Sequence, residues 1–537
     1  MRQFCQQVFV ILQQTADASV RTIAKVTGIP RSSVHRYRIG IVKRNQYPES
    51  HLWEREEGYQ WVCLLVCATV YVFGIMRGVG AESLSLFFSL IHLQPHIGIS
   101  PSAIRTIRRE MEAHILRYQQ EQESDQRQQA KCSLEVCVGA DETFFHEMLL
   151  VFMDLSSGFL FVEEAARNRT YNTWKARTQS RLQQLGMTVR YVVSDRAKAL
   201  IKLATDGFEC VNIPDLFHAS HEISKLFGAR LHRQRQRLQD KLSKAVAHLA
   251  LLQQLATASP EISAQQDVIV RLKSEYQHIA TGIETYTNLL HRISLLMHPF
   301  AILSVVCPVT SAHIVRELHD VAEALEALRD EYELTDSQKR LTKFAKQIDE
   351  LAAVIDTWWL WVEEHLEPYD LGDEYTLWLR ECLLPTIYWQ VQAERTTQPH
   401  LKDCYQHAAD QALDAFQRHP LTQGITEGDL AYWQPWAEYM VAKFQRASSA
   451  VEGRNGYLSQ MHHTGRGISP QRLQVLTVIH NFGLKRPDGT TAAQRLFGRE
   501  FPELFDWLVK QMGDLPLPRT SRTPVQRKLL SLQAVPP

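Results

Sequence analysis

Hydrophobic residues repeat with helical spacing at the start of the chain. Apolar positions over 20–26 predict one helix, Gly28 marks a turn, and 30–38 opens a second helix, so residues 1–45 are predicted to form a helix-turn-helix domain. The same pattern also fits any small amphipathic pair of helices. Side chains that can contact phosphates and base edges lie on the second helix: Arg31, Ser32, Ser33, Arg36 and Arg38.

Helical spacing continues through 101–120, which predicts a second helical domain within 46–130. Ser100 followed by proline is typical of a helix start, and the polar run 119–129 is interpreted as a linker. The longest apolar stretch, 61–75, is shorter than the roughly 20 residues that a membrane-spanning helix needs. We therefore expect a core helix there and no membrane partner.

From residue 133 the hydrophobic period changes to that of β-strands. Runs of β-branched and aromatic residues predict strands at 134–145, 148–155 and 159–163, the last two joined by a Ser-Ser-Gly hairpin turn. Asp154, which precedes this turn, is expected to make an Asx-turn. One helix and two further strands are expected at 172–185, 189–195 and 209–213.

A long helical region follows, and 219–440 is predicted to be an all-helical insertion. Residues 309–367 contain neither glycine nor proline, and Thr335-Asp-Ser-Gln338 matches a capping box between two helices. Helices are also expected in 441–512, whereas the proline-rich, basic tail 513–537 is predicted to be disordered. Two apolar stripes mark the buried faces of the insertion: Leu318, Val321, Leu325 and Leu328, then Leu341, Phe344, Ile348, Leu351 and Val354.

Three carboxylates lie at positions where a charged side chain is unusual unless it has a function. Asp141 lies inside an apolar strand, and Asp195 ends another strand, at the edge where ligand sites of α/β sheets collect. Glu452 shares a polar helical face with Asn455 and Ser459. Three such acids can hold two divalent cations about 3.5–4 Å apart, which clamp the attacking and leaving oxygens of a displacement at phosphorus. The predicted catalytic residues and metal ligands are Asp141, Asp195 and Glu452, with Mg²⁺ as the metal and Mn²⁺ as a substitute.

Other polar residues are assigned roles around these acids. Asp215, His218 and Asn455 are predicted to support the wall of the active site. His218 could instead pair with His221 in a metal site, and Glu452 could instead fold back as the last residue of a Ser449-x-x-Glu capping box. DNA contacts are predicted for Lys198, Lys202 and Arg454, although solvated lysines are the default alternative.

The amino-acid composition limits how the protein could bind DNA or metal, but it does not identify a binding partner. The 59 basic residues balance the 59 acidic residues, so DNA binding must depend on local basic patches rather than on net charge. The nine cysteines include no C-x2-C pair, which favours buried thiols in a reducing cytosol over a zinc site or disulfides.

Taken in order, these residues resemble the Asp-Asp-Glu transposases of bacterial insertion sequences, specifically those with a helical insertion before the final Glu. The motifs are Gly139-Ala-Asp141-Glu-Thr, Val193-Ser-Asp195-Arg-Ala-Lys-Ala, Asp215-Leu-Phe-His218, Ser448-Ser-Ala-Val-Glu452-Gly-Arg-Asn455-Gly and Ile479-His-Asn-Phe482. The βββαβαβ order similarly resembles the ribonuclease H fold. The resemblance implies an α/β ribonuclease H-like catalytic core, in 131–218 and 441–512, with an all-helical insertion and N-terminal DNA-binding helices.

The resemblance also implies a function. Such an enzyme binds the terminal inverted repeats of its element, cleaves a strand with metal-activated water and joins the freed 3′-hydroxyl to target DNA. It acts as a homo-oligomer on DNA in the bacterial cytoplasm, associated with the nucleoid. An aromatic residue of the insertion can stack on a flipped base, for which Trp358, Trp359 and Trp361 are candidates, with burial in a helical core as the alternative. Two other functions stay open: a DNA-binding protein without catalysis, and a ribonuclease H-like nuclease.

Overall fold

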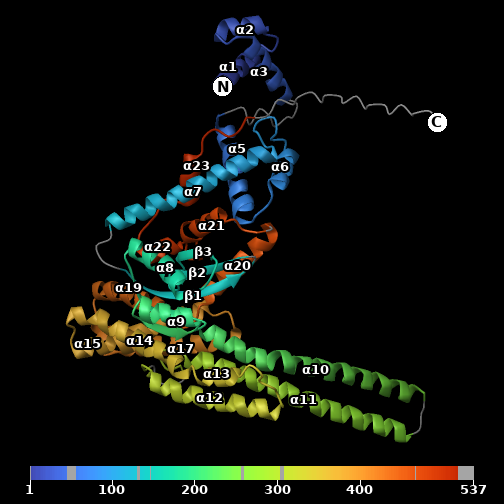
Figure 1. Ribbon diagram of the computed structural model, residues 1–537, viewed down its shortest axis with the longest axis vertical. Helices are drawn as coiled ribbons and strands as arrows, with labels where there is room; N and C mark the ends of the chain where they lie inside the picture. Colours follow the sequence, from blue (N-terminus) through green and yellow to red (C-terminus); the bar gives the residue numbers. More distant parts are fainter. Residues whose placement is uncertain are drawn as a thin grey trace. The chain divides into compact units, whose positions relative to one another are not determined.

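The computed structural model describes most of the chain as two compact units. The first unit comprises 1–125 and 457–537, and the second comprises 126–456. Both contain many helices, and the second holds a mixed five-stranded sheet (Figure 1). The described residues are 2–44, 56–129, 134–145, 147–255, 259–302, 307–465 and 467–517.

The first unit begins with three short helices that share a small core. They are α1 (Arg2–Gln14), α2 (Val20–Thr27) and α3 (Arg31–Arg44). The Ser19 side chain caps α2 by accepting from the Thr22 amide, and Gly28 ends the helix with φ of 71°, a conformation that glycine adopts without strain. The two predicted helices and the turn between them are therefore confirmed, and α1 is an addition to them. Their core residues include Val8, Ile23, Ile29, Val34 and Ile41.

The remaining helices of the first unit come from both ends of the chain. They are α5 (Glu56–Thr69), which continues as the π-helix η1 (Val70–Met76), α6 (Ala81–Leu90), α7 (Pro101–Gln129), α21 (Pro470–Phe482), α22 (Ala492–Phe497) and α23 (Leu504–Gln511).

Two sequence predictions in this unit are wrong. The expected linker 119–129 is the end of α7, because Gln122 and Glu123 are buried and continue the inner face of that helix. The predicted disordered tail begins too early, since Leu515 is buried and the Gly98 amide donates to the Pro516 carbonyl at 2.5 Å. Residues 518–537 lie outside the described part of the chain.

One helical stretch in the first unit, Glu57–Met76, has the length and composition of a membrane span, with a mean hydropathy of 1.8. Core helices of soluble proteins meet the same two criteria. Within its most apolar window, 44% of the residues are buried inside the protein.

The sheet of the second unit has the strand order β3-β2-β1-β4-β5. The first three strands pair antiparallel, and β1, β4 and β5 pair parallel. Helix α8 (Tyr171–Leu185) connects β3 to β4, whereas α9 (Lys198–Lys202) and the π-helix η2 (Leu203–Gly207) connect β4 to β5. The five predicted strands are confirmed: β1 (Leu134–Phe144), β2 (Met148–Asp154), β3 (Leu160–Ala166), β4 (Met187–Ser194) and β5 (Val211–Pro214).

The turn between β2 and β3 also forms as expected. Asp154 is buried, and its Oδ2 accepts from the Ser157 amide at 2.8 Å and from the Ser156 hydroxyl at 2.7 Å. This confirms the expected role of Asp154 in the turn, although its carboxylate accepts from the amide three residues on, not from the amide two residues on as in an Asx-turn.

Helices fill the region between β5 and the final helix α20 (Ser449–Gly465). The predicted apolar stripes of this region are buried, as expected. The longer helices are α10 (Leu216–Gln254), α11 (Ser259–Leu296), α12 (Ser311–Glu331), α14 (Ile348–Leu366), α16 (Leu384–Arg395), α17 (Pro399–Arg418) and α19 (Glu427–Lys443). The shorter ones are α13 (Arg340–Ala345), η3 (Glu367–Tyr369), α15 (Asp373–Trp378), η4 (Leu379–Leu383) and α18 (Pro420–Gly424).

The capping box predicted at 335–338 does not form. Helix α13 begins later, at Arg340, and the Leu341 amide donates to the Asp336 carboxylate at 3.0 Å instead. The predicted box is therefore the loop before the helix, in which Asp336 takes the capping role.

The tryptophans of α14 belong to the core rather than to a base-stacking surface. Trp358 and Trp361 have almost no exposed surface, and the Trp358 indole N–H donates to the Met440 carbonyl at 2.8 Å. Trp359 is 8% exposed and packs against Trp358. None of the three is placed to receive a flipped base, so the core alternative is correct.

The two faces of the sheet are covered by different helices. Phe152 packs against Trp174 of α8 on one face. On the other face, residues directly opposite one another across β1, β2 and β3 are Asp141, Val151 and Glu163. Arg454 of α20 reaches this face and makes a buried two-bond ion pair with Glu163, at 2.7 and 2.6 Å. The first turns of α20 therefore lie across the strands that carry Asp141.

Replacing Arg454 with alanine should destabilise the second unit by about 3–5 kcal/mol, because it leaves the Glu163 carboxylate buried without its partner. Denaturant unfolding followed by circular dichroism measures the change. The double variant Arg454→Met with Glu163→Leu removes both charges and should recover most of the loss. Equal losses in the two variants would show that packing, not the unpaired charge, dominates.

Candidate active site

Asp141 occupies the centre of the site because β1 brings it under α20. At Gly139, one position earlier on the same face, an added Cβ would lie 2.8 Å from Val451 Cγ2 and 2.7 Å from Leu155 Cδ2. Only a residue without a side chain lets the helix come this close to the strand. Asn455, one turn further along α20, then donates from Nδ2 to Asp141 Oδ2 at 2.9 Å.

His218 reaches the same point from the first turn of α10. Asp215 caps that helix by accepting from the Phe217 amide at 2.8 Å. The Asp215 carboxylate also lies 3.1 Å from His218 Nδ1, and on the other side of the ring Nε2 lies 3.7 Å from Glu452 Oε1. Asp215 thus acts through His218, as a carboxylate that positions a histidine ring.

Glu452 points into the site and not back to the start of its helix. Helix α20 begins at Ser449, and the preceding Ser448 hydroxyl donates to the Asp215 carboxylate. Ligand atoms of Asp141, His218 and Glu452 all lie within 4.8 Å of one another, and each of the three residues is half-buried. The two carboxylates could hold a cation, since they meet there from separate segments, and the His218 imidazole could join them as a ligand only in its neutral form.

Asp195 lies beside this group but is not part of it. In the parallel pairing of β1 with β4, Ala140 is opposite Ser194, so Asp141 and Asp195 follow at the same edge of the sheet. The Asp195 side chain is exposed, and its Oδ1 accepts from the Ala197 amide at 2.8 Å. The sheet therefore brings the two aspartates to neighbouring positions, while the Asp195 carboxylate bonds to its own loop.

Glu142 is an acid that the sequence analysis did not single out. It follows Asp141 on β1, faces the other side of the sheet and is buried, with Arg169 Nη1 3.5 Å from its Oε2. Burial, and then the nearby charge of Asp195, raise its pKa. Its position next to Asp141 places a second buried acid at this edge of the sheet.

The segment between α19 and α20 is fixed by buried hydrogen bonds. The Tyr191 hydroxyl on β4 donates to the Lys443 carbonyl at 2.6 Å and accepts from the Gln445 amide at 2.8 Å. The Arg446 guanidinium donates to the Ser294 carbonyl at 2.9 Å and to the Met297 carbonyl, at the end of α11. The Leu216 amide donates to the Arg446 carbonyl at 3.1 Å. These bonds hold the sheet, α10 and the insertion to the start of α20, and hence to Glu452.

Electrostatic repulsion between the acids is strong. Burial first, and then the negative charge of Glu452, raise the pKa of Asp141 from 3.8 to about 7. The contact with Asp215 raises the pKa of His218 from 6.5 to about 9, against the effect of its partial burial and with further help from Asp141 and Glu452. Burial would raise the pKa of Asp215, but its bonds to His218 and Ser448 hold that pKa below the ordinary value. His218 is therefore the positive group in a cluster of acids.

The residues predicted to contact DNA occupy different environments. Arg454 is removed from this set, because its guanidinium is buried and paired with Glu163. Lys198 is exposed, whereas Lys202 lies 3.7 Å from Asp206. On α3, Arg31, Ser32 and Arg36 are exposed, Ser33 is half-buried, and Arg38 donates to the Ala18 carbonyl at 3.0 Å, which stabilises the loop before α2.

Sequence reasoning missed the residues that hold the site together. Ser448, Tyr191 and Arg446 act through contacts between segments far apart in the chain, which no local pattern reveals. Gly139 could have been found, because a glycine inside a strand often marks a close approach of another backbone.

Comparison with known proteins gives one partial match. The model of a family described as "Family of unknown function (DUF6399)" matches residues 379–524, a range that includes Glu452 and Asn455. No curated protein matches the chain.

Replacing Asp141 with asparagine should stabilise the protein at neutral and alkaline pH in buffer containing EDTA. The raised pKa means that the folded protein favours the protonated acid, so the cost of folding grows as pH rises from about 4 to about 7. The gain in unfolding free energy should be about 2–3 kcal/mol near pH 8 and less than half of that near pH 5. Thermal unfolding across this pH range measures it, with the exposed Asp403→Asn as the control. A gain that does not depend on pH would contradict the assignment.

Proposed function

We propose that this protein is a DNA transposase, an enzyme that cleaves DNA strands at the ends of a mobile element and joins them to target DNA. One observation carries the proposal: Asp141, Glu452 and His218 converge within 4.8 Å, with Asp195 at the neighbouring strand end. Buried acids that repel one another at such an edge are costly to a fold, and cation-dependent chemistry at phosphorus is the use that accounts for them. The five-stranded sheet, with its order β3-β2-β1-β4-β5, is compatible with a ribonuclease H-like core.

The residues present fit a divalent cation. Asp141 and Glu452 offer oxygen ligands of the kind that Mg²⁺ and Mn²⁺ prefer, and Asp195 offers a third at the exposed mouth of the site. The raised pKa of Asp141 is what is expected of a ligand whose charge is balanced only when a cation is bound. Bound there, divalent cations would activate the attacking oxygen and stabilise the leaving oxygen at phosphorus.

The chain's own residues would prepare the site for this chemistry. Asn455 holds the Asp141 carboxylate in place by donating a hydrogen bond to one of its oxygens. His218, kept protonated by Asp215, offers a positive charge to a phosphate oxygen beside Glu452. Lys198, exposed after β4, is positioned to contact the strand that is cut.

Recognition of DNA is assigned to the N-terminal helices. Arg31, Ser32 and Arg36 present an exposed polar surface on α3, the second helix of the helix-turn-helix pair. We infer that this surface reads the terminal repeats, and that the protein acts as a homo-oligomer on DNA in the bacterial cytoplasm.

Replacing any of Asp141, Asp195 or Glu452 with its amide should abolish strand cleavage while leaving DNA binding within about twofold of wild type. The amide keeps the shape of the acid but removes the charge that holds a cation, so the loss should appear in the chemical step. Cleavage of labelled duplex DNA is assayed in Mg²⁺, in Mn²⁺ and in EDTA, with Asp403→Asn as the control. Full wild-type cleavage in EDTA would refute the proposal.

Replacing Arg36 with alanine should weaken binding to the element's ends by about 1–3 kcal/mol if the side chain reads a base, or lower the salt dependence by about one unit if it contacts a phosphate. The exposed Lys402→Ala on α17 removes the same charge elsewhere and serves as the control. Unchanged affinity and salt dependence would show that α3 faces solvent in the complex.

A further inference from the structure

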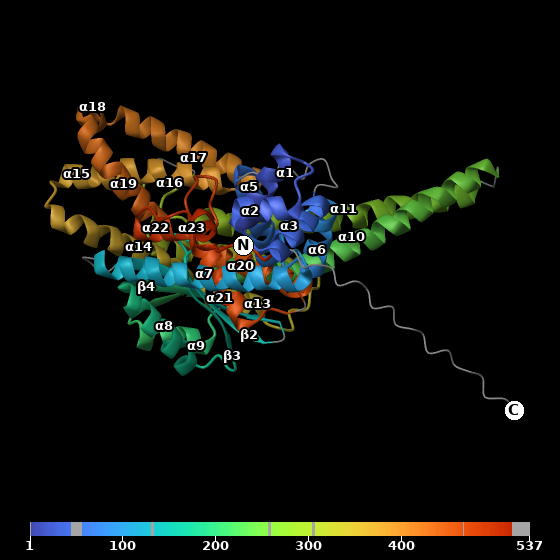
Figure 2. The ribbon, with the colours of Figure 1, turned by 90° about the horizontal axis from the view of Figure 1, so that it is seen from above.

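Helices α10 and α11 form a long antiparallel hairpin, the arm, within the second unit. Near its base, an added Cβ at Gly228 would lie 3.3 Å from the Tyr286 hydroxyl, and further out Gln265 Nε2 donates to the Ala245 carbonyl at 2.8 Å. Residues later in α10 therefore pack against residues earlier in α11, as expected of two antiparallel helices. Figures 1 and 2 show the outer halves of both helices extending past the other helices of this unit.

The outer part of the arm has very little core of its own. On α10, Ala245 is the one buried residue beyond Leu231 among those the structure describes. On the outer half of α11, Ile269 is buried and its neighbour Val270 is 67% exposed. Two helices that protrude with so few buried residues contribute little to the stability of the fold, which leaves their surface free for a partner.

One flank of α10 carries a continuous row of cations, the α10 basic stripe. Its members recur at intervals of three or four residues and therefore lie on one helical face. Among the described residues, Arg237, Lys241 and Lys244 are exposed and form no ion pair with an acid. Arg230 donates to the Thr335 carbonyl at 2.5 Å, and Arg233 donates to the Ala229 carbonyl at 2.8 Å. The α10 basic stripe consists of Arg230, Arg233, Arg237, Lys241 and Lys244.

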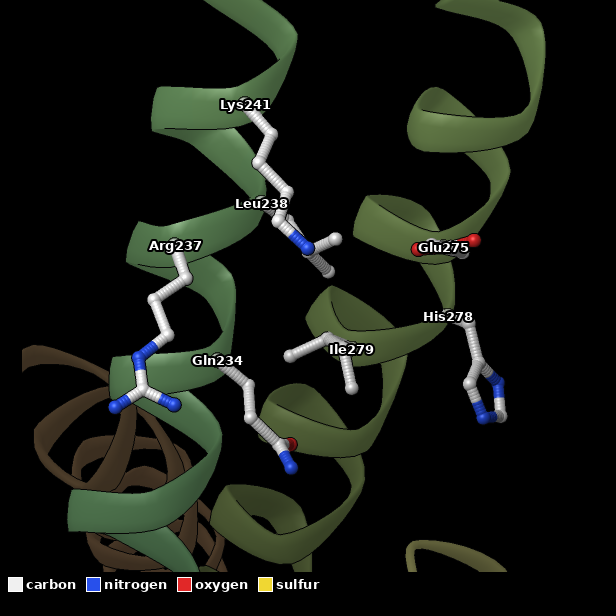
Figure 3. Close-up of a pocket in the computed structure, with 7 residues that line it drawn as sticks. All are labelled: Gln234, Arg237, Leu238, Lys241, Glu275, His278 and Ile279. Carbon is white, nitrogen blue, oxygen red and sulfur yellow. The ribbon is translucent and has the colours of Figure 1, made fainter. Parts of the chain in front are cut away.

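The stripe borders a groove between the two helices. The groove has a volume of about 300 Å³, and its lining includes Arg237 and Lys241 from α10 and Glu275 and His278 from α11. In Figure 3, Leu238 and Ile279 lie between the helices, while Arg237 extends along α10 and His278 extends from the side of α11 away from α10. Glu275 is the one acid on the groove, so the cations outnumber it.

We propose that the α10 basic stripe is a second DNA-contacting surface, which holds the phosphate backbone of a duplex away from the cleavage site. From Arg230 to Lys244 the stripe spans about 21 Å at about 1.5 Å per residue. The same length of duplex carries about 12 phosphates, so the phosphates outnumber the cations of the stripe.

Charge complementarity favours DNA over a protein partner. Between residues 230 and 244, where the stripe lies, α10 exposes no large hydrophobic residue, and the exposed Leu251 and Leu255 lie beyond it towards the tip of the arm. Protein interfaces depend instead on buried aromatic and aliphatic residues at their centre. Contacts of this kind position the duplex and carry no sequence information. The inference rests on the proposed function for its DNA substrate, but not on the cleavage chemistry.

The test compares two double variants of the full-length protein, each lacking two positive charges on the same arm. Arg237→Gln with Lys241→Gln changes the stripe, while Arg235→Gln with Lys273→Gln changes the opposite flank. Binding to a short labelled duplex is measured by fluorescence anisotropy across a range of salt concentrations. The stripe variant should lower the slope of log K against log salt by about 2, and the control variant by much less. Circular dichroism verifies that both variants keep wild-type helix content.

Each other outcome overturns the proposal. Equal slopes for the two variants would show that the arm contributes only general charge. A lowered slope with single-stranded RNA alone would assign the stripe to RNA, and a change in self-association with an unchanged slope would assign it to a second copy of the chain. Failure of the proposed function would be seen separately, as a wild-type protein that binds duplex DNA through the stripe and does not cleave it in Mg²⁺.

Discussion

The close approach of α20 to β1 at Gly139 is the contact on which the site depends. Val451 occupies the space that a side chain at 139 would fill, and this sets the height of the helix above the sheet. The buried pair of Arg454 with Glu163 then sets its rotation, because the two hydrogen bonds of a guanidinium and a carboxylate tolerate little turning. Because the height and rotation of α20 are fixed, the side chains of Asn455 and Glu452 are placed beside Asp141.

The electrostatics of the site follow from this geometry. A half-buried Asp141 next to Glu452 is unfavourable as an anion, and its pKa is raised first by burial and then by the negative charge of Glu452. The fold tolerates it because Asp215 holds a protonated His218 between the acids. A partly compensated cluster of this kind is poised to take up a cation, and a fully neutral or fully paired cluster would not be.

The sequence predicted the parts of this structure that depend on local patterns. The five strands, the buried stripes of the helical region and the turn at Asp154 follow from hydrophobic period and turn chemistry, which act over a few residues. Apart from the capping box at 335–338, which is a local pattern that does not form, the errors concern residues whose environment is set by distant parts of the chain. Arg454 was assigned to DNA because nothing near it in the chain reveals Glu163, and the polar run 119–129 was assigned to a linker because its burial depends on other helices. For the same reason, Tyr191 and Arg446 could not be identified from the sequence.

Those two residues explain why a helical region of this size can stand between the strands and the last acid without disturbing the site. Tyr191 ties the segment after α19 to β4, and Arg446 ties it to the end of α11, so the chain leaves the insertion at a position set by the sheet. The helical region between β5 and α20 therefore does not act as a loose loop whose ends must be brought together, for which closure would cost entropy. This helical region acts as a rigid support, so the position of α20 depends on the packing of helices far from Asp141. Changes within that support should consequently alter the position of Glu452 before they alter the sheet.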